Sequence, residues 1–508
     1  MSRCSTFAEL LSAGPDGAVA IAAPDTPALR YQGLRAHIIR TVVALNRFGI
    51  GRNDRVAIVL KNGPEMGAAF IAVGCGATAA PLNPAYRAEE FEFYLSDLNA
   101  RALIVEAGSD SPAIAAAQKL DIPLIELTPT PQAGAGRFDL KLRDRSPGAL
   151  GAGGWAQAGD IALILHTSGT TSRPKIVPLT QRNVCTSAGN IAQTLRFTGA
   201  DRGLNIMPLF HIHGLIAGLL APLSAGSYVY CTPGFNALKF FGWMEDCKPT
   251  WYTAVPTMHQ TILTRAGKNS ETIARYPLRF VRSSSSSLPV QVFREVEDVF
   301  KAPVIEAYGM TEAAHQMCSN PLPPGARKPG TVGIAAGPEV AIMSNEGRLL
   351  PANGTGEIVI RGANVTASYE NNPRANAENF TNGWFRTGDQ GSMDAEGYLS
   401  ITGRLKEIIN RGGEKVSPLE VDEVLMDHPA VQQVVTFAMP HDKLGEEVAA
   451  AVVLREGGQA TEKDIREFAA RHLADFKVPR KILFMDEIPK GSTGKLQRIG
   501  LAQKLGLG

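Results

Sequence analysis

Short apolar runs alternate with alanine-rich stretches along the first four-fifths of the chain, and this alternation constrains the fold more than any other feature. The runs RVAIVL from Arg55, RALIVE from Arg101 and IALILH from Ile161 have the length and composition of buried strands. The segments between them are long enough to form the helical connections that parallel strands need. The pattern predicts an α/β protein whose large N-terminal part consists of layered subdomains with buried sheets.

A second, smaller unit is predicted near the C-terminus. The chain has 508 residues, which is more than one hydrophobic core usually accommodates. The segment TGRLKEIINRGGEKVSP from Thr402 ends the long alternating region, and VQQVVTFAM and AAAVVL after it have the composition of strands. We therefore expect a domain over residues 1–404, a mobile α+β domain over residues 405–508, and a hinge at residues 404–406.

Two helix starts support an independent C-terminal unit. Ser417 and Glu420 have the spacing of a capping box, and Pro418 stands at the first helical position. Thr461 and Asp464 have the same spacing before the stretch EKDIREFAARHL. Both patterns predict helices that begin at defined residues within the last hundred or so positions.

Composition excludes several classes of function. The formal net charge is +2 and the pI is near 8.1, too mild for a protein that binds nucleic acid or a membrane surface. The six cysteines form no CxxC pair, which argues against a zinc site or a disulfide framework. The first residues lack the pattern of a secretory signal, and the apolar run from Gly214 is too short to span a bilayer. We expect a cytoplasmic protein.

The segment LILHTSGTTSRPK, from Leu163 to Lys175, is predicted to be a strand followed by a phosphate-binding loop. Its backbone amides, hydroxyls and terminal lysine are groups that hold phosphate oxygens. A Walker A loop is the first alternative, but Pro174 and Ile176 stand where that motif needs glycine and Ser/Thr. An ordinary turn is the second alternative, because serine, threonine and glycine also favour turns.

Four further motifs follow in order, and together with this loop they carry a resemblance. They are EAYGMTE (306–312), RTGD (386–389), GRLKEIINRGGEKVSP (from 403) and PKGSTGKLQR (489–498). The series resembles the adenylate-forming superfamily of acyl-CoA synthetases, luciferases and adenylation domains over essentially the whole chain. The resemblance implies an acyl-CoA synthetase/luciferase-like fold and a two-step reaction: a carboxylate attacks ATP to give an acyl-adenylate, and a thiol, usually that of coenzyme A, then displaces AMP.

The resemblance also implies which residues bind ATP and Mg²⁺. The phosphate-binding residues would be Thr167, Ser168, Gly169, Thr170, Thr171 and Lys175. Glu312, assisted by Thr167, would hold the Mg²⁺, and oxygen ligands of this kind suit a hard cation. Thr311 beside it belongs to the implied catalytic set. Without the resemblance, a glutamate at a helix start is more often a surface charge that complements the helix dipole.

The same resemblance assigns the nucleoside. The residues around the base would be Glu306, Ala307, Tyr308, Gly309, Met310 and Thr311. Tyr308 would stack on adenine, although a single aromatic residue more often belongs to the core. Asp389 would accept hydrogen bonds from the ribose hydroxyls. Without the resemblance, the Gly388-Asp389 pair would more simply indicate a turn. Arg404 would contact ribose or phosphate.

The C-terminal unit is implied to move between the two steps. Lys495 lies in a Gly/Ser/Thr-rich loop and would approach the carboxylate and the α-phosphate during adenylation. Lys406 occupies the hinge position, and Gly412 and Gly413 would face the coenzyme A channel in the second step. Exposed lysines are usually only solvated, so Lys495 depends on the resemblance for its role.

Five consecutive serines, 283–287, stand where the family usually has a glycine/alanine-rich segment beside the acid. Such a run can be a flexible linker or the polar wall of a site. The run, with MTEAAHQMCSNPLPP, resembles the oxalate–CoA ligase branch of the superfamily, which implies that Ser285, Ser286 and His315 contact the acid, with His211 from another wall. Two roles stay open for His213: it belongs to the same polar wall, or it simply packs against the turn before Gly214.

Other acids and other classes remain open. Malonate, acetate or a coumarate-like acid is the nearest alternative substrate, and a carrier-loading adenylation enzyme or a non-catalytic nucleotide-binding protein is more distant. Glu312, Asp389, Arg404 and Lys495 occur together, which argues against a non-catalytic protein. The expected partners are a small carboxylic acid, ATP and coenzyme A, with the chain acting as a monomer or homodimer.

Overall fold

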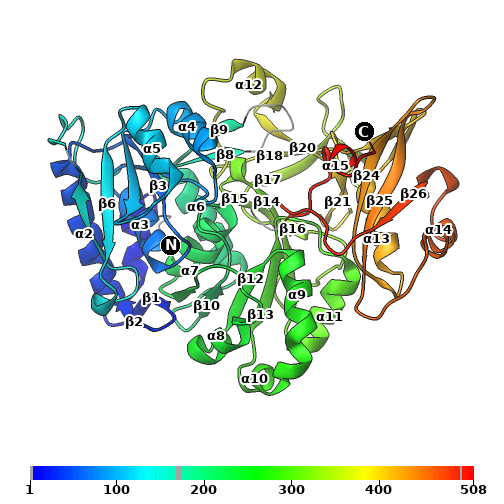
Figure 1. Ribbon diagram of the computed structural model, residues 1–508, viewed down its shortest axis with the longest axis horizontal. Coiled ribbons are helices and arrows are strands. Elements are labelled where there is room, and N and C mark those ends of the chain that lie inside the picture. Colours follow the sequence, from blue (N-terminus) through cyan, green and yellow to red (C-terminus); the bar gives the residue numbers. More distant parts are fainter. Residues whose placement is uncertain (1–3, 144, 168–173, 492–494, 508) are drawn as a thin grey trace.

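The computed structural model describes residues 4–143, 145–167, 174–491 and 495–507, and these residues form four β-sheets (Figure 1). The first sheet has seven strands in the order β7 (Phe138–Leu142), β6 (Leu124–Pro129), β5 (Ala102–Glu106), β3 (Arg55–Val59), β4 (Thr78–Pro81), β8 (Ile161–Thr167) and β9 (Lys175–Thr180). Its inner strands are parallel, whereas β7 and β9 are antiparallel edges. The expected strands at RVAIVL, RALIVE and IALILH are β3, β5 and β8.

The second sheet has nine strands and is also mainly parallel. Its order is β16 (Ile334–Ala335), β15 (His315–Ser319), β14 (Val304–Met310), β13 (Phe280–Ser284), β12 (Trp251–Ala254), β10 (Arg202–Asn205), β11 (Tyr228–Cys231), β1 (Val19–Ala23) and β2 (Thr26–Arg30). The pairings from β1 through β14 are parallel, and β2, β15 and β16 pair antiparallel. The predicted α/β architecture with buried sheets is confirmed.

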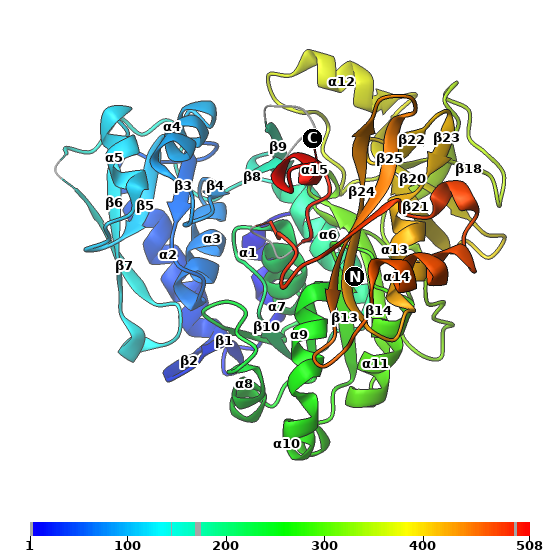
Figure 2. The same cartoon turned by 45° about the vertical axis from the view of Figure 1, so that its right-hand side comes forward.

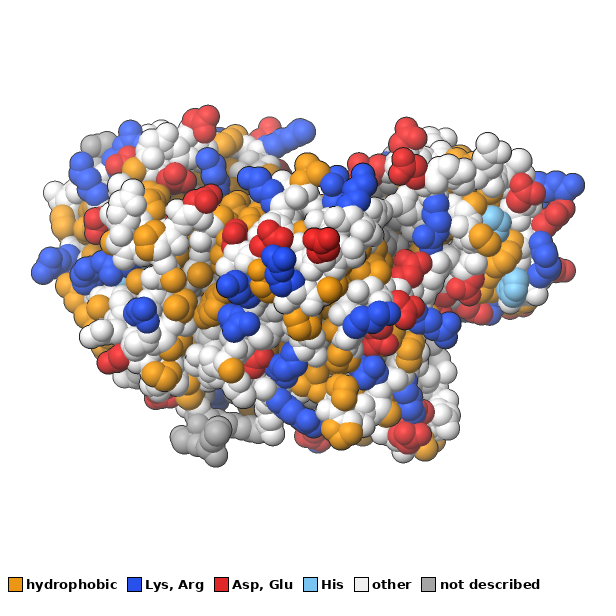
Figure 3. All heavy atoms as spheres, turned by 90° about the horizontal axis from the view of Figure 1, so that it is seen from below, with side chains coloured by type: hydrophobic (Ala, Val, Ile, Leu, Met, Phe, Trp, Pro, Cys, Tyr) orange, Lys and Arg blue, Asp and Glu red, His pale blue; other side chains and the backbone are white. Residues whose placement is uncertain are grey.

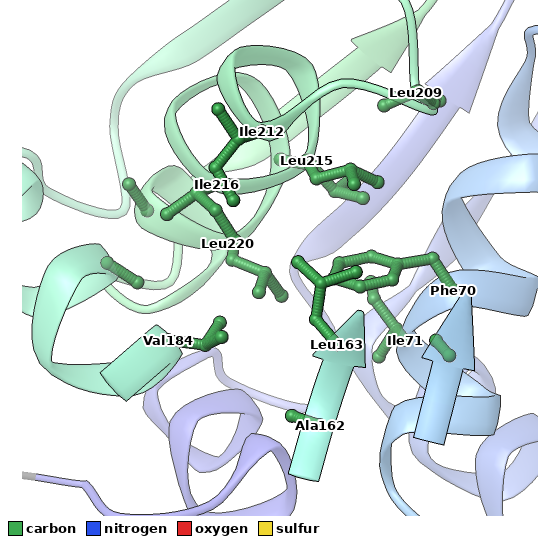
Figure 4. Packing of buried hydrophobic residues seen from close by; sticks show 14 of the residues in the cluster. Phe70, Ile71, Ala162, Leu163, Val184, Leu209, Ile212, Leu215, Ile216 and Leu220 are labelled. Carbon is green, nitrogen blue, oxygen red and sulfur yellow. The ribbon is translucent and has the colours of Figure 1, made fainter. Parts of the chain in front are cut away.

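Helices between these two sheets form the central layer of the core. They include α2 (Tyr31–Arg47), α3 (Pro64–Gly74), α6 (Gln181–Thr194), the π-helix η3 (His213–Leu220) and α7 (Ala221–Leu223). Helix α3 is apolar on nearly every side because it contacts strands of both sheets. Figure 4 shows Phe70 of α3, Leu163 of β8 and Leu220 of η3 packed against one another.

The outer faces of the two sheets carry the other helices. The seven-stranded sheet is covered by α4 (Ala88–Asp97) and α5 (Pro112–Lys119). The nine-stranded sheet is covered by α8 (Phe240–Cys247), α9 (Pro256–Ala266), α10 (Ser270–Arg275) and α11 (Val290–Phe300). Burial on both faces explains why the central strands are continuous apolar runs and do not alternate.

Two smaller sheets complete the molecule. One comprises β17 (Glu339–Met343), β18 (Thr355–Arg361), β19 (Phe380–Thr381), β20 (Trp384–Met393) and β21 (Leu399–Arg404), and the other β22 (Ile409–Arg411), β23 (Glu414–Val416), β24 (Val431–His441), β25 (Gly445–Leu454) and β26 (Lys481–Phe484). Figures 1 and 2 show the latter beside the nine-stranded sheet at one end of the molecule. Short helices elsewhere in the chain include α1 (Phe7–Leu10), α12 (Pro373–Asn379) and α15 (Leu501–Lys504).

The two predicted helix starts of the C-terminal unit are present, but one capping box is incomplete. In α14 (Glu462–Ala470) the side chain of Thr461 caps the Asp464 amide and the Asp464 side chain returns to Thr461. In α13 (Pro418–Met426) Ser417 caps the Glu420 amide as expected. The Glu420 carboxylate instead pairs with Lys477 at 2.6 Å, so its reciprocal bond is missing.

Two surface properties bear on possible partners: the distribution of charge and the apolarity of the helices. Figure 3 shows one face on which basic and acidic side chains are interspersed, with no extended basic region. Among the described residues, no helix has both the length and the apolarity needed to cross a bilayer.

Candidate active site

The predicted site residues gather near the carboxyl ends of β13 and β14, a usual position for ligands in parallel α/β sheets. The motif EAYGMTE (306–312) covers most of β14 and enters the 3₁₀ turn η5 (Thr311–Ala313), which leads into β15. A Cβ atom at Gly309 would lie only 1.7 Å from the carbonyl oxygen of His315. The glycine therefore lets these two strands approach where the motif turns.

Asp389 is held by two of the predicted nucleotide-binding residues. The Tyr308 hydroxyl donates to Asp389 Oδ2 at 2.5 Å, and Arg404 Nε donates to Oδ1 at 3.0 Å. These contacts join β14 to the neighbouring strands β20 and β21. Burial, followed by the adjacent Asp389 charge, raises the pKa of Tyr308 well above its usual value, so the tyrosine stays a hydrogen-bond donor. The structure thus brings Tyr308, Asp389 and Arg404 together.

Glu312 is buried beside a residue that the sequence did not indicate. The Tyr369 hydroxyl donates to Glu312 Oε1 at 2.7 Å, and Lys175 Nζ lies 4.4 Å from the centre of the Tyr369 ring. Burial raises the pKa of Glu312, whereas the hydrogen bond from Tyr369 and the charge of Lys175 lower it. The three side chains place one carboxylate and one ammonium group around a single aromatic ring.

The predicted phosphate-binding segment is described only at its two ends. Thr167 at the end of β8 pairs in register with Lys175 at the start of β9. The predicted contacts at Ser168, Gly169, Thr170 and Thr171 lie outside the described residues. Burial is the main cause that lowers the pKa of Lys175. Among the described residues there is no group of three His, Cys, Asp or Glu suited to a metal ion.

Lys495 of the C-terminal unit lies near this cluster. Burial lowers its pKa to about 8, and the nearby Arg404 adds to the effect, while the carboxylates of Asp389 and Glu312 oppose it. The positive charge of Lys495 also contributes to the lowered pKa of His211. Lys495 therefore interacts electrostatically both with the predicted nucleotide-binding residues Asp389 and Arg404 and with His211.

The predicted acid-binding residues form a hydrogen-bonded group, with a different histidine at its centre. His213 Nδ1 lies 3.0 Å from Ser285 Oγ, and its ring stacks on the ring of His315 with centroids 4.9 Å apart. His213 is the first residue of the π-helix, a helix type that is frequent at functional sites. Of the two roles open for His213, simple packing against a turn does not account for these contacts. His213 links η3 to β13 and β15.

Two residues of this group have unusual backbone conformations. Ser285 has a φ of 77° and His315 a φ of 101°, both in the region that favours glycine. Conformations of this kind cost of the order of 1–3 kcal/mol each and are concentrated at functional sites. The serine run is not a linker, because Ser283 and Ser284 are buried and Ser284 ends β13.

Other predicted residues lie at the margins of this group. His211 Nδ1 accepts a 3.4 Å hydrogen bond from the His213 amide, and burial lowers the pKa of His211 to about 3. Ser286 is exposed and lines a cavity of about 90 Å³ that Lys495 also lines. Gly412 and Gly413 join β22 to β23 with positive φ, and Lys406 is exposed. In the described chain, none of these last three residues forms a hydrogen bond or an ion pair with the histidine group.

Sequence reasoning missed Tyr369 and Arg282. Tyr369 stands outside the five motifs, and nothing in its neighbours indicates that its hydroxyl reaches Glu312. Arg282 begins the predicted serine stretch, yet its side chain lies fully buried behind His213 and His315. An arginine inside an apolar strand is a signal that could have been followed, since arginine is almost never fully buried without a partner.

Comparison with known proteins agrees with this geometry. Residues 9–370 match the model of the AMP-binding enzyme family, and residues 420–495 match that of the AMP-binding enzyme C-terminal domain. The chain belongs to the AMP-binding enzyme family. It is an acid–thiol ligase that forms an acyl-adenylate from ATP and transfers the acyl group to coenzyme A.

Relatives of this AMP-binding enzyme include named CoA ligases. An oxalate–CoA ligase of Arabidopsis thaliana is 48% identical over 461 residues, covering 90% of this chain and 89% of that protein. An oxalate–CoA ligase of Saccharomyces cerevisiae is 42% identical over 480 residues, covering 89% of this chain and 87% of that protein. The crystal structure of ATP-bound MatB from Rhodopseudomonas palustris has a TM-score of 0.88 with 29% identity, covering 98% of both chains.

Proposed function

We propose that this AMP-binding enzyme converts oxalate to oxalyl-CoA in the cytoplasm. The observation that carries the proposal is the polar wall formed by Ser285, His213 and His315, which replaces an apolar lining beside the acid. A long aliphatic acid would offer no acceptor to the remaining donors of this wall, and a buried donor left unpaired costs about 1–3 kcal/mol. A second carboxylate would instead accept their hydrogen bonds. The named activity of the two oxalate–CoA ligases supports the same choice.

In the first step, one oxalate carboxylate oxygen attacks the α-phosphorus of ATP, and the bond to pyrophosphate breaks. The difficulty is that an anion approaches a polyanion. Lys495 would offset this charge at the reacting carboxylate and α-phosphate, while Lys175 and the loop from Thr167 would hold the outer phosphates. Tyr308, Asp389 and Arg404 would orient the nucleoside, with Asp389 accepting from the ribose hydroxyls.

Glu312 and Thr167 are the residues that would hold Mg²⁺. Glu312 has the chemistry for this role, because it is a buried carboxylate close to a cationic lysine at the end of the phosphate-binding segment. One carboxylate is enough for Mg²⁺, which usually keeps waters and phosphate oxygens as its other ligands. When bound, the ion would neutralise charge on the ATP phosphates.

In the second step, the coenzyme A sulfur attacks the acyl carbonyl carbon and AMP leaves. The structure has Lys495 close to Asp389 and Glu312, as adenylation would require. Gln260 contacts Gln432 at 3.1 Å, and Glu295 pairs with Arg455 at 3.4 Å, across the two units. We propose that these contacts break as the C-terminal unit turns about Lys406, which would bring Gly412 and Gly413 to the thiol channel.

A pyrophosphate-release panel tests the substrate. Oxalate, malonate, acetate, octanoate and a cinnamate would each be supplied with ATP and Mg²⁺, with and without coenzyme A. Oxalate should give the highest kcat/KM, and coenzyme A should be consumed in equal amount. Higher turnover of another acid would overturn the oxalate assignment while leaving the ligase class intact. Release without any use of coenzyme A would favour a carrier-loading enzyme.

The pH dependence of adenylation should report the charge of Lys495. A lysine whose pKa is about 8 is positively charged below that pH and loses its charge as the pH rises through it. The kcat/KM for ATP should therefore fall above about pH 8, and this falling limb should be absent in Lys495→Arg, because arginine keeps its charge. Pyrophosphate release measured from pH 6 to pH 10 tests this. An identical falling limb in both enzymes would contradict it.

Removal of the acid contacts should weaken oxalate use selectively. Ser285→Ala or His315→Ala should lower kcat/KM for oxalate by about 10- to 100-fold, because each loses a hydrogen bond to a charged carboxylate. The KM for ATP should change little, since neither residue belongs to the nucleotide group. Ser224→Ala is a suitable control, because that hydroxyl only bonds the Ala221 carbonyl at 2.7 Å. Unchanged oxalate kinetics in both variants would contradict the assignment of Ser285 and His315 to the acid pocket.

A further inference from the structure

A buried arginine stands behind the proposed acid pocket. Arg282 lies in β13, an inner strand of the nine-stranded sheet, in register with Thr253 on β12 and Ile305 on β14. It is 0% exposed. Within the part of the chain that the structure describes, no carboxylate forms an ion pair with it, and its Nε has no hydrogen-bond partner. Burying a charge without a partner of opposite charge destabilises the folded state, so the burial of this guanidinium suggests a functional role.

The hydrogen bonds of Arg282 determine which ring nitrogens carry protons. Nη1 lies 3.2 Å from His213 Nε2, and Nη2 lies 3.1 Å from His315 Nε2. A guanidinium can only donate, so both Nε2 atoms accept and each neutral ring carries its hydrogen on Nδ1. Gln316 Oε1, 3.4 Å from Nη2, accepts from the same guanidinium, and the Thr253 hydroxyl donates to His213 Nε2 at 2.6 Å.

The two histidines themselves bring no positive charge to the pocket. Burial lowers the pKa of both His213 and His315 far below the usual value. The neighbouring His315 lowers that of His213 further, and the charge of Arg282 lowers both. His213 Nδ1–H donates to Ser285 Oγ at 3.0 Å, which leaves the serine hydrogen free to be donated in turn. The wall therefore presents neutral donors, and the guanidinium of Arg282 lies behind them, hydrogen-bonded to both rings.

We infer that Arg282 is a positioning residue that makes the pocket select acids with a second negative charge. It would do so in two ways: it sets the tautomers of His213 and His315, and it places a cation behind them that favours a distal carboxylate. The inference rests on the acid pocket given under the proposed function, but not on oxalate being the acid.

A purely structural role for Arg282 is the rival explanation, and a pair of isosteric acids separates the two. Oxamate has the shape of oxalate but carries a neutral amide where oxalate carries its second carboxylate. A structural defect would reduce the use of both acids alike. Loss of the charge would reduce the use of oxalate more, so the ratio of the two kcat/KM values is the informative quantity.

The test compares this ratio in the full-length wild type, Arg282→Gln and Gln316→Glu. Arg282→Gln removes the charge, and Gln316→Glu neutralises it in place with an isosteric carboxylate beside Nη2. We expect the oxalate:oxamate ratio to fall about 10- to 100-fold in both variants, with little change in the KM for ATP. Arg279→Gln is the matched control, because Arg279 already pairs with Asp201 at 2.9 Å, and its ratio should equal that of the wild type.

Each outcome decides the inference. An unchanged ratio in Gln316→Glu overturns it even if Arg282→Gln fails to fold, and equal loss of both acids in Arg282→Gln also overturns it. Equal kcat/KM values of the wild type for oxalate and oxamate would also overturn the inference. If the wild type does not use oxalate at all, the proposed function fails separately. Malonate and malonamate, which differ in the same way, then provide the ratio.

Discussion

Lys495→Ala is expected to lower the rate of acyl-adenylate formation by about 10²–10³-fold, while thioester formation from supplied acyl-adenylate stays close to the wild-type rate. The reason is the location of the ammonium group. Its charge is felt by Asp389, Glu312 and His211, so it lies between the nucleotide residues and the acid wall. The side chain is also partly buried, so water screens its charge less than at an exposed site, and a nearby developing negative charge would be stabilised.

The two half-reactions can be measured separately. Adenylation is followed by pyrophosphate release, and thioester formation by consumption of coenzyme A from chemically prepared acyl-adenylate. Lys490→Ala is the matched control, because Lys490 belongs to the same loop but pairs with Glu487 at 2.8 Å. It should leave both rates near those of the wild type. Equal loss of both half-reactions in Lys495→Ala would contradict a division of labour between two orientations of the C-terminal unit.

The sequence predicted the layers of the fold well because apolar pattern and burial are directly linked. Strands β3, β5 and β8 are buried on both faces, so each is a continuous apolar run that needs no tertiary information to recognise. The capping box at Thr461 formed because both of its partners are local and exposed. The box at Ser417 is half complete because a distant residue, Lys477, competes for the Glu420 carboxylate.

The acid pocket could be predicted only in part, for a similar reason. Ser285 and His315 belong to stretches with a distinctive composition, and the structure brings both to His213. The contacts of Arg282 come from η3 and β15, 69 and 33 residues away along the chain, and no spacing rule connects them. The π-helix that begins at His213 is likewise invisible in an apolar segment such as HGLIAGLL, since no period distinguishes it.

Glu312→Gln is expected to lower adenylation by about 10²–10³-fold and to raise the Mg²⁺ concentration needed for half-maximal rate. The substitution keeps the shape of the side chain and its ability to accept from the Tyr369 hydroxyl, so packing should be preserved. It removes the negative charge that faces Lys175 at the end of the phosphate-binding segment. Without that charge the proposed site has lost its one carboxylate ligand for a hard cation.

The control for this variant is Glu378→Gln, because the Glu378 carboxylate also acts on the charge of Lys175 but is not buried. Glu378 also influences Lys175, but it is fully exposed and pairs with Arg374 at 2.8 Å, so water and a partner already screen its charge. Its Mg²⁺ dependence should match that of the wild type. Pyrophosphate release measured against Mg²⁺ concentration at saturating ATP gives both curves. An unchanged half-maximal Mg²⁺ concentration in Glu312→Gln would assign the carboxylate to positioning Tyr369 and Lys175, and not to the metal.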